Sequence, residues 1–283
     1  MDFNNREIAI GVWLALVLLV MLHQKAIRLS LLRLLRTVLQ VKIVVPLLSL
    51  LVYVSIIIAL LSMIGLWSKV LLKDTVYWFV GVGLVLFGKS VEYKNFMREW
   101  NKLVKEQIGI LVVLTFIMNS YTFSLPVELL LVPLAVAIVM ITTVADMNKG
   151  FADIARLFGI IQAVLGWLVL IAAFAKAIND YTAFATLKSI QRFFLPFALT
   201  VFAIPFMYAL ALYARYDYVL VWSAYNHPRK LTRYIRLKAL RYGGLNLTKA
   251  NHLSNISPHE FMQVRSPKEF DALITQLKKK SED

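Results

Sequence analysis

The chain of 283 residues contains no cysteine. Disulfides, thiolate zinc sites, thiolate-bound iron–sulfur clusters and cysteine nucleophiles are therefore excluded. Charge is also scarce, since only 17% of the residues are charged, against 60% that are hydrophobic, and the mean hydropathy is +0.70. A soluble fold could not bury so much apolar surface, whereas a bilayer requires it to be exposed. The composition therefore predicts an integral membrane protein.

The usual signatures of membrane enzymes are missing as well. The four histidines lack metal-ligand spacing, and neither H-E-x-x-H nor G-x-S-x-G occurs. Asn179-Asp180 matches only the beginning of a prenyltransferase N-D-x-x-D motif, because position 183 is alanine. We therefore expect no catalytic residue, no metal site and no cofactor.

Seven segments are long and apolar enough to cross a bilayer. The second, residues 44–66, is the clearest because it contains no charge, and the first, residues 8–22, is the shortest. The expected fold class is all-α, a polytopic helical membrane protein of about seven transmembrane helices. The other five segments are residues 75–88, 108–123, 127–145, 158–175 and 193–214.

The basic residues between these segments fall mostly on one side. With the N-terminus outside, 25 of the 31 Lys and Arg residues belong to segments that face the cytoplasm. Because basic residues in short loops resist translocation, this asymmetry predicts an N-out, C-in topology. If residues 8–22 only lay along the surface, six spans would remain and the N-terminus would be inside. The expected location is a bacterial plasma (inner) membrane.

Two of the predicted cytoplasmic segments combine basic residues with regularly spaced apolar ones. Residues 25–41 follow the first span, and residues 229–242 follow the last. Such spacing predicts amphipathic helices on the membrane surface, where each basic residue near an anionic leaflet contributes about 1 kcal/mol. Their position beside the membrane favours lipid over nucleic acid as a partner. The candidate contacts to anionic headgroups are Arg28, Arg33, Arg36, Arg229, Lys230, Arg233, Arg236, Lys238 and Arg241.

The predicted organisation has two parts. Residues 1–225 form a transmembrane helical bundle with amphipathic connectors, and residues 226–283 form a short basic cytoplasmic tail. Adjacent glycines, Gly243-Gly244, should end the basic helix of the tail. Ser257 and Ser266 are each followed by proline and, three residues after the serine, by glutamate. This capping-box arrangement predicts two further short helices.

Residues 83–90 match the Walker A expression G-x-x-x-x-G-K-[ST]. A P-loop needs a buried strand before it and free backbone N–H groups for phosphate, but these residues lie in an apolar span that should keep its N–H groups in a helix. We therefore interpret Gly81, Gly83 and Gly88 as sites of close helix–helix contact, and Lys89 as a side chain that reaches the inner interface.

Glu128 is the one ionisable residue that we place inside a predicted span, at the outer end of residues 127–145. Asn119 and Tyr121 lie close by, at the end of the preceding span. Because an acidic group within a span can bind a proton or cation, these three are candidate pathway residues. The sequence favours a simpler interpretation, a hydrated interfacial carboxylate with no obligatory partner. Pro133, further along the same helix, should free a backbone carbonyl.

These features support three hypotheses for function. The leading one is a non-catalytic, membrane-embedded assembly or effector subunit that docks partners, either other protein subunits or further copies of itself, through its basic cytoplasmic face. The alternative is a small-solute or ion transporter or channel built around the fourth and fifth spans. The third is a membrane enzyme acting on a lipid headgroup. The scarcity of charges inside the spans favours the first hypothesis over the second.

Overall fold

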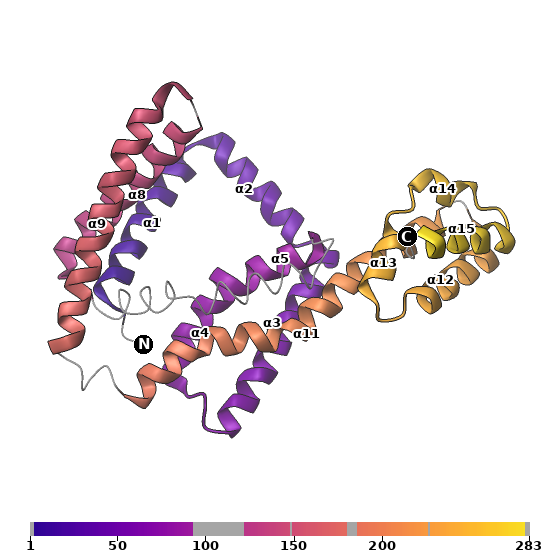
Figure 1. Cartoon of the computed structure of the whole chain (residues 1–283), viewed down its shortest axis with the longest axis horizontal. Helices are drawn as coiled ribbons and strands as arrows, with labels where there is room; N and C mark the ends of the chain where they lie inside the picture. Colours follow the sequence, from indigo (N-terminus) through magenta and orange to yellow (C-terminus); the bar gives the residue numbers. More distant parts are fainter. Residues whose placement is uncertain (1–2, 93–121, 148, 180–185, 226, 281–283) are drawn as a thin grey trace. The chain divides into compact units, whose positions relative to one another are not determined.

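A computed structural model describes residues 3–92, 122–147, 149–179, 186–225 and 227–280, and every regular element in this part of the chain is helical. Two short 3₁₀ turns, Lys69–Leu71 and Lys149–Phe151, and one π-helical segment, Phe79–Gly83, adjoin the α-helices. The α-helices in Figure 1 are α1 (Asn5–His23), α2 (Lys25–Val38), α3 (Val41–Met63), α4 (Leu72–Trp78), α5 (Leu84–Glu92), α8 (Leu125–Asp146), α9 (Ala152–Asn179), α11 (Leu187–Ala224), α12 (Arg229–Gly243), α13 (Leu247–Ser254), α14 (Pro258–Gln263) and α15 (Pro267–Lys280).

Six helical segments of the described residues are long and apolar enough to cross a membrane. They confirm as helices the first, second, third, fifth, sixth and seventh segments expected from the sequence. The fourth, residues 108–123, lies outside the described residues except for its last two positions. The six segments are Asn5–His23, Val41–Met63, Lys69–Val91, Leu125–Asp146, Ala152–Lys176 and Lys188–Ala224. The chain is thus all-helical, with helices of the length and composition that suggest a membrane-embedded protein.

Local sequence signals explain where several helices begin and end. The Asn4 side chain accepts a hydrogen bond from the N–H of Glu7, whose carboxylate accepts one from the N–H of Asn4, so a capping box begins α1. Pro126 occupies the first turn of α8, where its missing N–H costs nothing. After α3, Gly65 takes a positive φ of 74°, which a residue with a Cβ adopts only with strain.

The last candidate span is much longer than a bilayer requires. At 1.5 Å per residue, the 38 residues of α11 extend about 57 Å, against a hydrocarbon core of about 30 Å. The sequence predicted only residues 193–214, because Arg215 ends the apolar run there. The helix continues because its final turns pack against the C-terminal helices.

The chain divides into two compact units. In the first unit, α8 packs against both α1 and α9 (Figure 1). In the second unit, side chains of α3, α4 and α5 contact α11, which also carries the C-terminal helices. The first unit comprises Met1–Val45, Gly65–Lys73 and Gln107–Leu195, and the second comprises Pro46–Ile64, Asp74–Glu106 and Pro196–Asp283.

Within the first unit, an aromatic side chain compensates for the proline in α8. Pro133 has no N–H, so the carbonyl of Leu129, four residues earlier, lacks its usual helical donor. The indole Nε1–H of Trp13 in α1 donates to that carbonyl at 2.8 Å. The carbonyl that the sequence predicted Pro133 would free is therefore found, and its donor comes from a neighbouring helix.

The second unit has related contacts beside the prolines of α11. The hydroxyl of Tyr53 in α3 donates to the carbonyl of Phe202, three residues before Pro205, at 3.0 Å. The indole Nε1–H of Trp78 donates to the hydroxyl of Thr200 at 2.9 Å. These bonds join helices in an apolar setting that offers few other partners to a polar group. The side chain of Trp78 is buried in this contact.

Helices α12–α15, here called the C-terminal cluster, enclose a small hydrophobic core. The capping box predicted at Ser257 is present and begins α14, and Ser266 accepts from the N–H of Glu269 at the start of α15. Helix α13 was not expected from the sequence. The buried core consists of Leu231, Ile235 and Ala239 from α12, Leu247, Ala250 and Leu253 from α13, Phe261 from α14, and Phe270 and Ile274 from α15, with Ile256 and Val264 between helices.

The C-terminal cluster is fixed to the end of α11 by tyrosine hydroxyls. Tyr208, Tyr216 and Tyr218 donate to the carbonyls of Leu245, Gly244 and Ile256 at 2.7, 2.8 and 3.0 Å. Each acceptor lies in a turn of the cluster, where carbonyls have no helical donor. The side chain of Tyr216 is buried in this contact. The tail is therefore a folded extension of α11.

Candidate functional site

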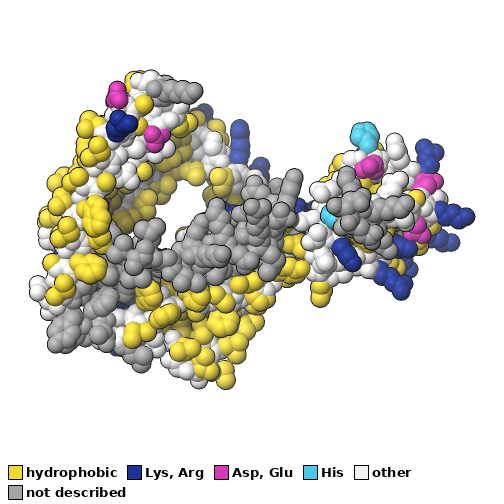
Figure 2. All heavy atoms as spheres, in the orientation of Figure 1, with side chains coloured by type: hydrophobic (Ala, Val, Ile, Leu, Met, Phe, Trp, Pro, Cys, Tyr) yellow, Lys and Arg dark blue, Asp and Glu magenta, His cyan; other side chains and the backbone are white. Residues whose placement is uncertain are grey.

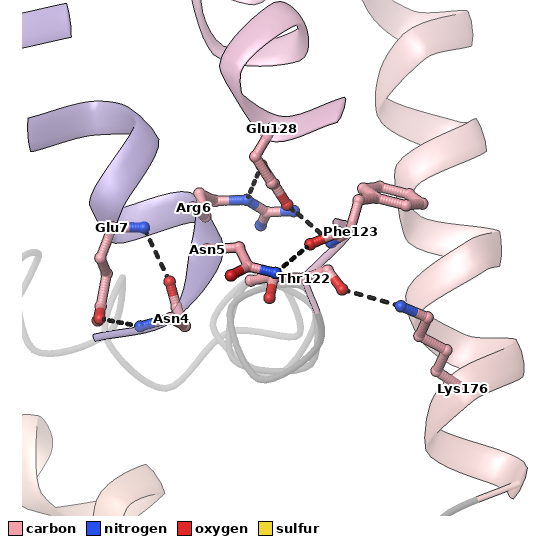
Figure 3. A network of polar contacts seen from close by, with 8 residues as sticks. All are labelled: Asn4, Asn5, Arg6, Glu7, Thr122, Phe123, Glu128 and Lys176. Atoms are coloured by element: carbon pink, nitrogen blue, oxygen red, sulfur yellow. Dashed lines mark hydrogen bonds and ion pairs between the residues drawn. The ribbon is translucent and has the colours of Figure 1, made fainter. Parts of the chain in front are cut away.

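The most enclosed charged group among the described residues is Glu128 in the first turn of α8. Its side chain is 0% exposed, and that of its partner Arg6 is 15% exposed. Arg6 donates from Nε to Oε2 and from Nη2 to Oε1, both at 3.1 Å, while the N–H of Phe123 donates to Oε1 at 3.0 Å (Figure 3). The expectation of a hydrated carboxylate without an obligatory partner is wrong. The starts of α1 and α8 meet at this point, and their contact encloses both side chains.

Side chains from α1 and α9 bind the short segment that precedes α8. Asn5 of α1 donates from Nδ2 to the carbonyl of Phe123 at 2.8 Å. Lys176 of α9 donates from Nζ to the carbonyl of Thr122 at 2.8 Å and lies 5.5 Å from the centre of the Phe123 ring. Figure 3 shows these side chains converging on residues 122–123 from α1 and α9. Three helices are therefore joined at one end of the first unit.

A second ion pair extends this network. Lys73 donates from Nζ to the carboxylate of Glu7 at 3.0 Å, and both side chains are largely buried. The same Glu7 oxygen accepts from the N–H of Asn4 at 2.8 Å. Glu7 therefore begins α1 and neutralises Lys73 at the same time. Two buried acids and the cations that face them balance charge here, which limits the cost of desolvation.

This arrangement suits a structural contact better than an ion pathway. Both oxygens of Glu128 accept charge-assisted or backbone hydrogen bonds, so a cation would have to displace the guanidinium of Arg6. Asn119 and Tyr121 lie outside the described residues, so the pathway assigned to them and to Glu128 stays a prediction. Within the described ranges, no three His, Asp or Glu side chains are grouped so that they could hold a metal ion.

The second candidate site is the outer face of α12. Four of its basic side chains, Arg229, Lys230, Arg233 and Arg241, are exposed, and Leu237 and Leu240 between them are 62% and 45% exposed. The opposite face, with Leu231, Ile235 and Ala239, is buried in the C-terminal cluster. Figure 2 shows Lys and Arg side chains over the surface of this cluster. The apolar stripe expected to rest on lipid instead forms the core of the cluster.

Two of the basic residues assigned to lipid headgroups have partners within the second unit. Arg236 donates from Nη2 to the carbonyl of Leu220 at 3.0 Å and from Nε to the hydroxyl of Ser223 at 3.2 Å. These acceptors lie in the last turn of α11, where a cation complements the helix dipole. Lys238 pairs with Asp271 of α15 at 3.0 Å.

The Lys238–Asp271 pair aligns α12 with α15. The hydrogen bond from Lys238, together with one from Tyr234, holds the pKa of Asp271 below its ordinary value of 3.8. The same hydrogen bond raises the pKa of Lys238 above 10.5. Both side chains therefore stay charged over a wide range around neutral pH. Since they are 39% and 43% exposed, solvent screens the pair and its contribution to stability is small.

The remaining lipid-contact candidates, Arg28, Arg33 and Arg36, are exposed on α2. The Walker-like residues 83–90 are helical, as expected, and Lys89 is exposed. The interpretation of the glycines is not supported, because a Cβ added at Gly81 or Gly88 would meet no atom within 4 Å, and one at Gly83 would touch only Trp78 and Phe79. The described helices do not pack closely at these positions.

Several residues of these sites were missed from the sequence. Arg6 was counted only as one of the few external basic residues, although it precedes Glu7 in an Asn4-x-x-Glu7 capping pattern that marks the start of a helix. Trp13 carried one usable signal, since its N–H needs an acceptor and Pro133 supplies a free carbonyl. Nothing local to Tyr208 or Tyr218 indicates their acceptors, which come from later segments.

In comparisons with known proteins, no family model matches the chain, and no curated protein or solved structure is significantly similar to it.

Proposed function

We propose that the chain is a non-catalytic, membrane-embedded assembly or effector subunit that docks an acidic partner protein through the outer face of α12. The observation that carries this proposal is the division of α12 into a buried apolar face and an exposed basic one. Leu237 and Leu240 lie among Arg229, Arg233 and Arg241 on the exposed face, and arginine is enriched at protein interfaces and among the residues that dominate their binding energy.

The attachment of the C-terminal cluster supports this function. Because Tyr216 and Arg236 fix the cluster to the end of α11, a partner bound to α12 would be held at a defined position beside the membrane. A mobile basic tail would have to order itself on binding, which costs affinity. The pre-formed cluster avoids that cost.

The proposal includes a topology of seven spans in a bacterial plasma membrane, with the N-terminus outside and the C-terminal cluster in the cytoplasm. The distribution of 25 of the 31 basic residues on one side supports this orientation. The span that raises the count from six to seven is the fourth in the chain, residues 108–123. In this arrangement the network of Arg6 and Glu128 lies at the outer surface.

Copurification in mild detergent with charge-reversed variants tests the docking face. We expect Arg229→Glu/Arg233→Glu/Arg241→Glu to lose an acidic partner that the unchanged protein retains. The matched control is Lys249→Glu/Arg265→Glu/Lys268→Glu, which reverses three exposed basic residues elsewhere on the same cluster and should keep the partner. Equal retention by both triple variants would overturn the proposal. Loss of acidic lipid, and not protein, from the first variant would assign the face to the membrane.

Transport is the second candidate function, and burial of Glu128 within a candidate span is the observation that favours it. A neutral substitution cannot separate the two functions, because breaking a buried pair also destabilises the fold. The exchanged variant Arg6→Glu/Glu128→Arg keeps both charges but moves the carboxylate to α1. If Glu128 carried ions, flux across proteoliposomes would be present in the unchanged protein and lost in the exchanged one. We expect no ion flux in either.

A further inference from the structure

Helix α2 presents a second amphipathic surface, which differs from α12 in one respect. A single residue, Gln24, separates it from α1, and only Leu39 and Gln40 separate it from α3. Both neighbouring helices are candidate membrane spans. The 14 residues of α2 are therefore attached at both ends to segments suited to the bilayer.

One face of α2 is wholly apolar, and the other is mainly basic. At 100° per residue, one side carries apolar residues at the spacing i, i+4, i+7, i+8 and i+11. The other side carries Lys25, Arg33 and Arg36 with two small polar residues and the exposed Leu29 and Leu32, and Arg28 lies at the boundary. The helix contains four basic residues and no acidic one. The apolar face consists of Ile27, Leu31, Leu34, Leu35 and Val38.

Within the described part of the chain, this apolar face is only partly covered, with Ile27 and Leu31 half-buried. None of the residues of α2 is buried, and Leu34 and Leu35 are 59% and 53% exposed. In α12, by contrast, Leu231 and Ile235 are enclosed by the C-terminal cluster. Helices α2 and α12 therefore share a sequence pattern but differ in environment. The apolar face of α12 packs against protein, whereas that of α2 is largely exposed.

We propose that α2 lies in the plane of an anionic membrane surface, with its apolar face in the acyl–headgroup boundary and its basic side chains on acidic headgroups. The occupant follows from the attachment and the charge. Since both neighbours of α2 are candidate spans, the helix is kept close to the bilayer, and its four cations without an acid complement an anionic leaflet. This surface is separate from the docking face of α12, so the two proposals stand or fall independently.

The absence of cysteine makes a direct test possible, because a single introduced thiol reports on one position. Leu31→Cys and Leu34→Cys place a fluorophore on the apolar face, and the controls Ser30→Cys and Thr37→Cys place it on the polar face. Each full-length variant is reconstituted in phosphatidylcholine vesicles with or without phosphatidylglycerol. With the acidic lipid, we expect quenching by brominated lipid to be several-fold stronger at positions 31 and 34, and quenching by iodide to be stronger at 30 and 37.

The arginines are tested in the Leu34→Cys background. Arg28→Gln/Arg33→Gln/Arg36→Gln should lose most of the lipid quenching, while replacement of the same three residues by lysine should keep it. Equal quenching at positions 30 and 34 would overturn the in-plane orientation. Equal quenching with and without phosphatidylglycerol would overturn the anionic contact. Disulfide formation between Leu34→Cys chains that rises with the protein-to-lipid ratio would assign the face to a second copy of the chain.

Discussion

Substitution of Arg6 or Glu128 should destabilise the protein strongly, because each charge is largely removed from solvent and is neutralised by the other. Arg6→Gln or Glu128→Gln leaves one buried charge without its partner, which costs about 3–5 kcal/mol in such pairs. We expect the double variant to lose less than the sum of the two single losses, because it leaves no uncompensated charge. The free energies of unfolding are measured by titration with sodium dodecyl sulfate, with the loss of helical circular dichroism as the signal.

An exposed pair provides the control for this measurement. Lys238 and Asp271 are joined at the same kind of distance, 3.0 Å, but two-fifths of each side chain is in contact with solvent. Lys238→Gln should therefore cost much less than either single change in the buried pair. Strictly additive losses at Arg6 and Glu128, or losses as small as that at Lys238, would contradict a coupled buried pair.

At the scale of helices, Trp13 and Pro133 should behave as one element. Trp13→Phe keeps an aromatic ring but removes the donor to the carbonyl of Leu129, which should destabilise the protein by about 1 kcal/mol. In a Pro133→Ala background, the restored N–H can bond to the same carbonyl, so Trp13→Phe should cost less. The same unfolding titration on the four proteins measures the coupling. An equal cost in both backgrounds would show that Pro133 does not create the need for Trp13.

Alanine substitutions at two glycines should change stability in opposite directions. One glycine lies at the contact between α11 and the C-terminal cluster, and the other, in α9, serves as the control. A Cβ at Gly243 would overlap the hydroxyl of Tyr216, so Gly243→Ala should disturb the bond to Gly244 and destabilise the cluster by about 1–3 kcal/mol. Gly159 in α9 has open space around it, and Gly159→Ala should stabilise its helix by roughly 0.5–1 kcal/mol. Hydrogen exchange of α12 and α13 should rise only in the first variant. Unchanged exchange would place Tyr216 outside the contact.

The helices themselves could be predicted from the sequence because their signals are local. Apolar runs located the spans, and the capping residue Ser257 located the start of α14. The side on which an amphipathic helix is covered is not a local property. Helix α12 turns Ile235 inward because Phe261 and Phe270, from later segments, complete a core around it. For the same reason, nothing near Glu128 indicated a partner 122 residues earlier in the chain.

At the scale of the whole molecule, topology is the property on which the functional proposal depends. A reporter fused after Asp283 should be active in the cytoplasm, and one fused before Met1 should be external, because the basic residues resist translocation. An internal N-terminus together with an internal C-terminus would remove α1 from the set of spans. It would also place Arg6 on the opposite side of the membrane from Glu128, which would contradict the ion pair between them.

The docking of an acidic protein to α12 is the central claim, and site-specific photocrosslinking in cells tests it most directly. A photoreactive residue at Leu237, and one at Leu240, should each form an adduct with one and the same partner protein. The crosslink should lie in an acidic segment of that partner. The adduct should disappear with Arg233→Glu. Met262, which is 40% exposed on α14, is the control position and should give no such adduct. Adducts to lipid alone at Leu237, or the same protein adduct at Met262, would contradict the account.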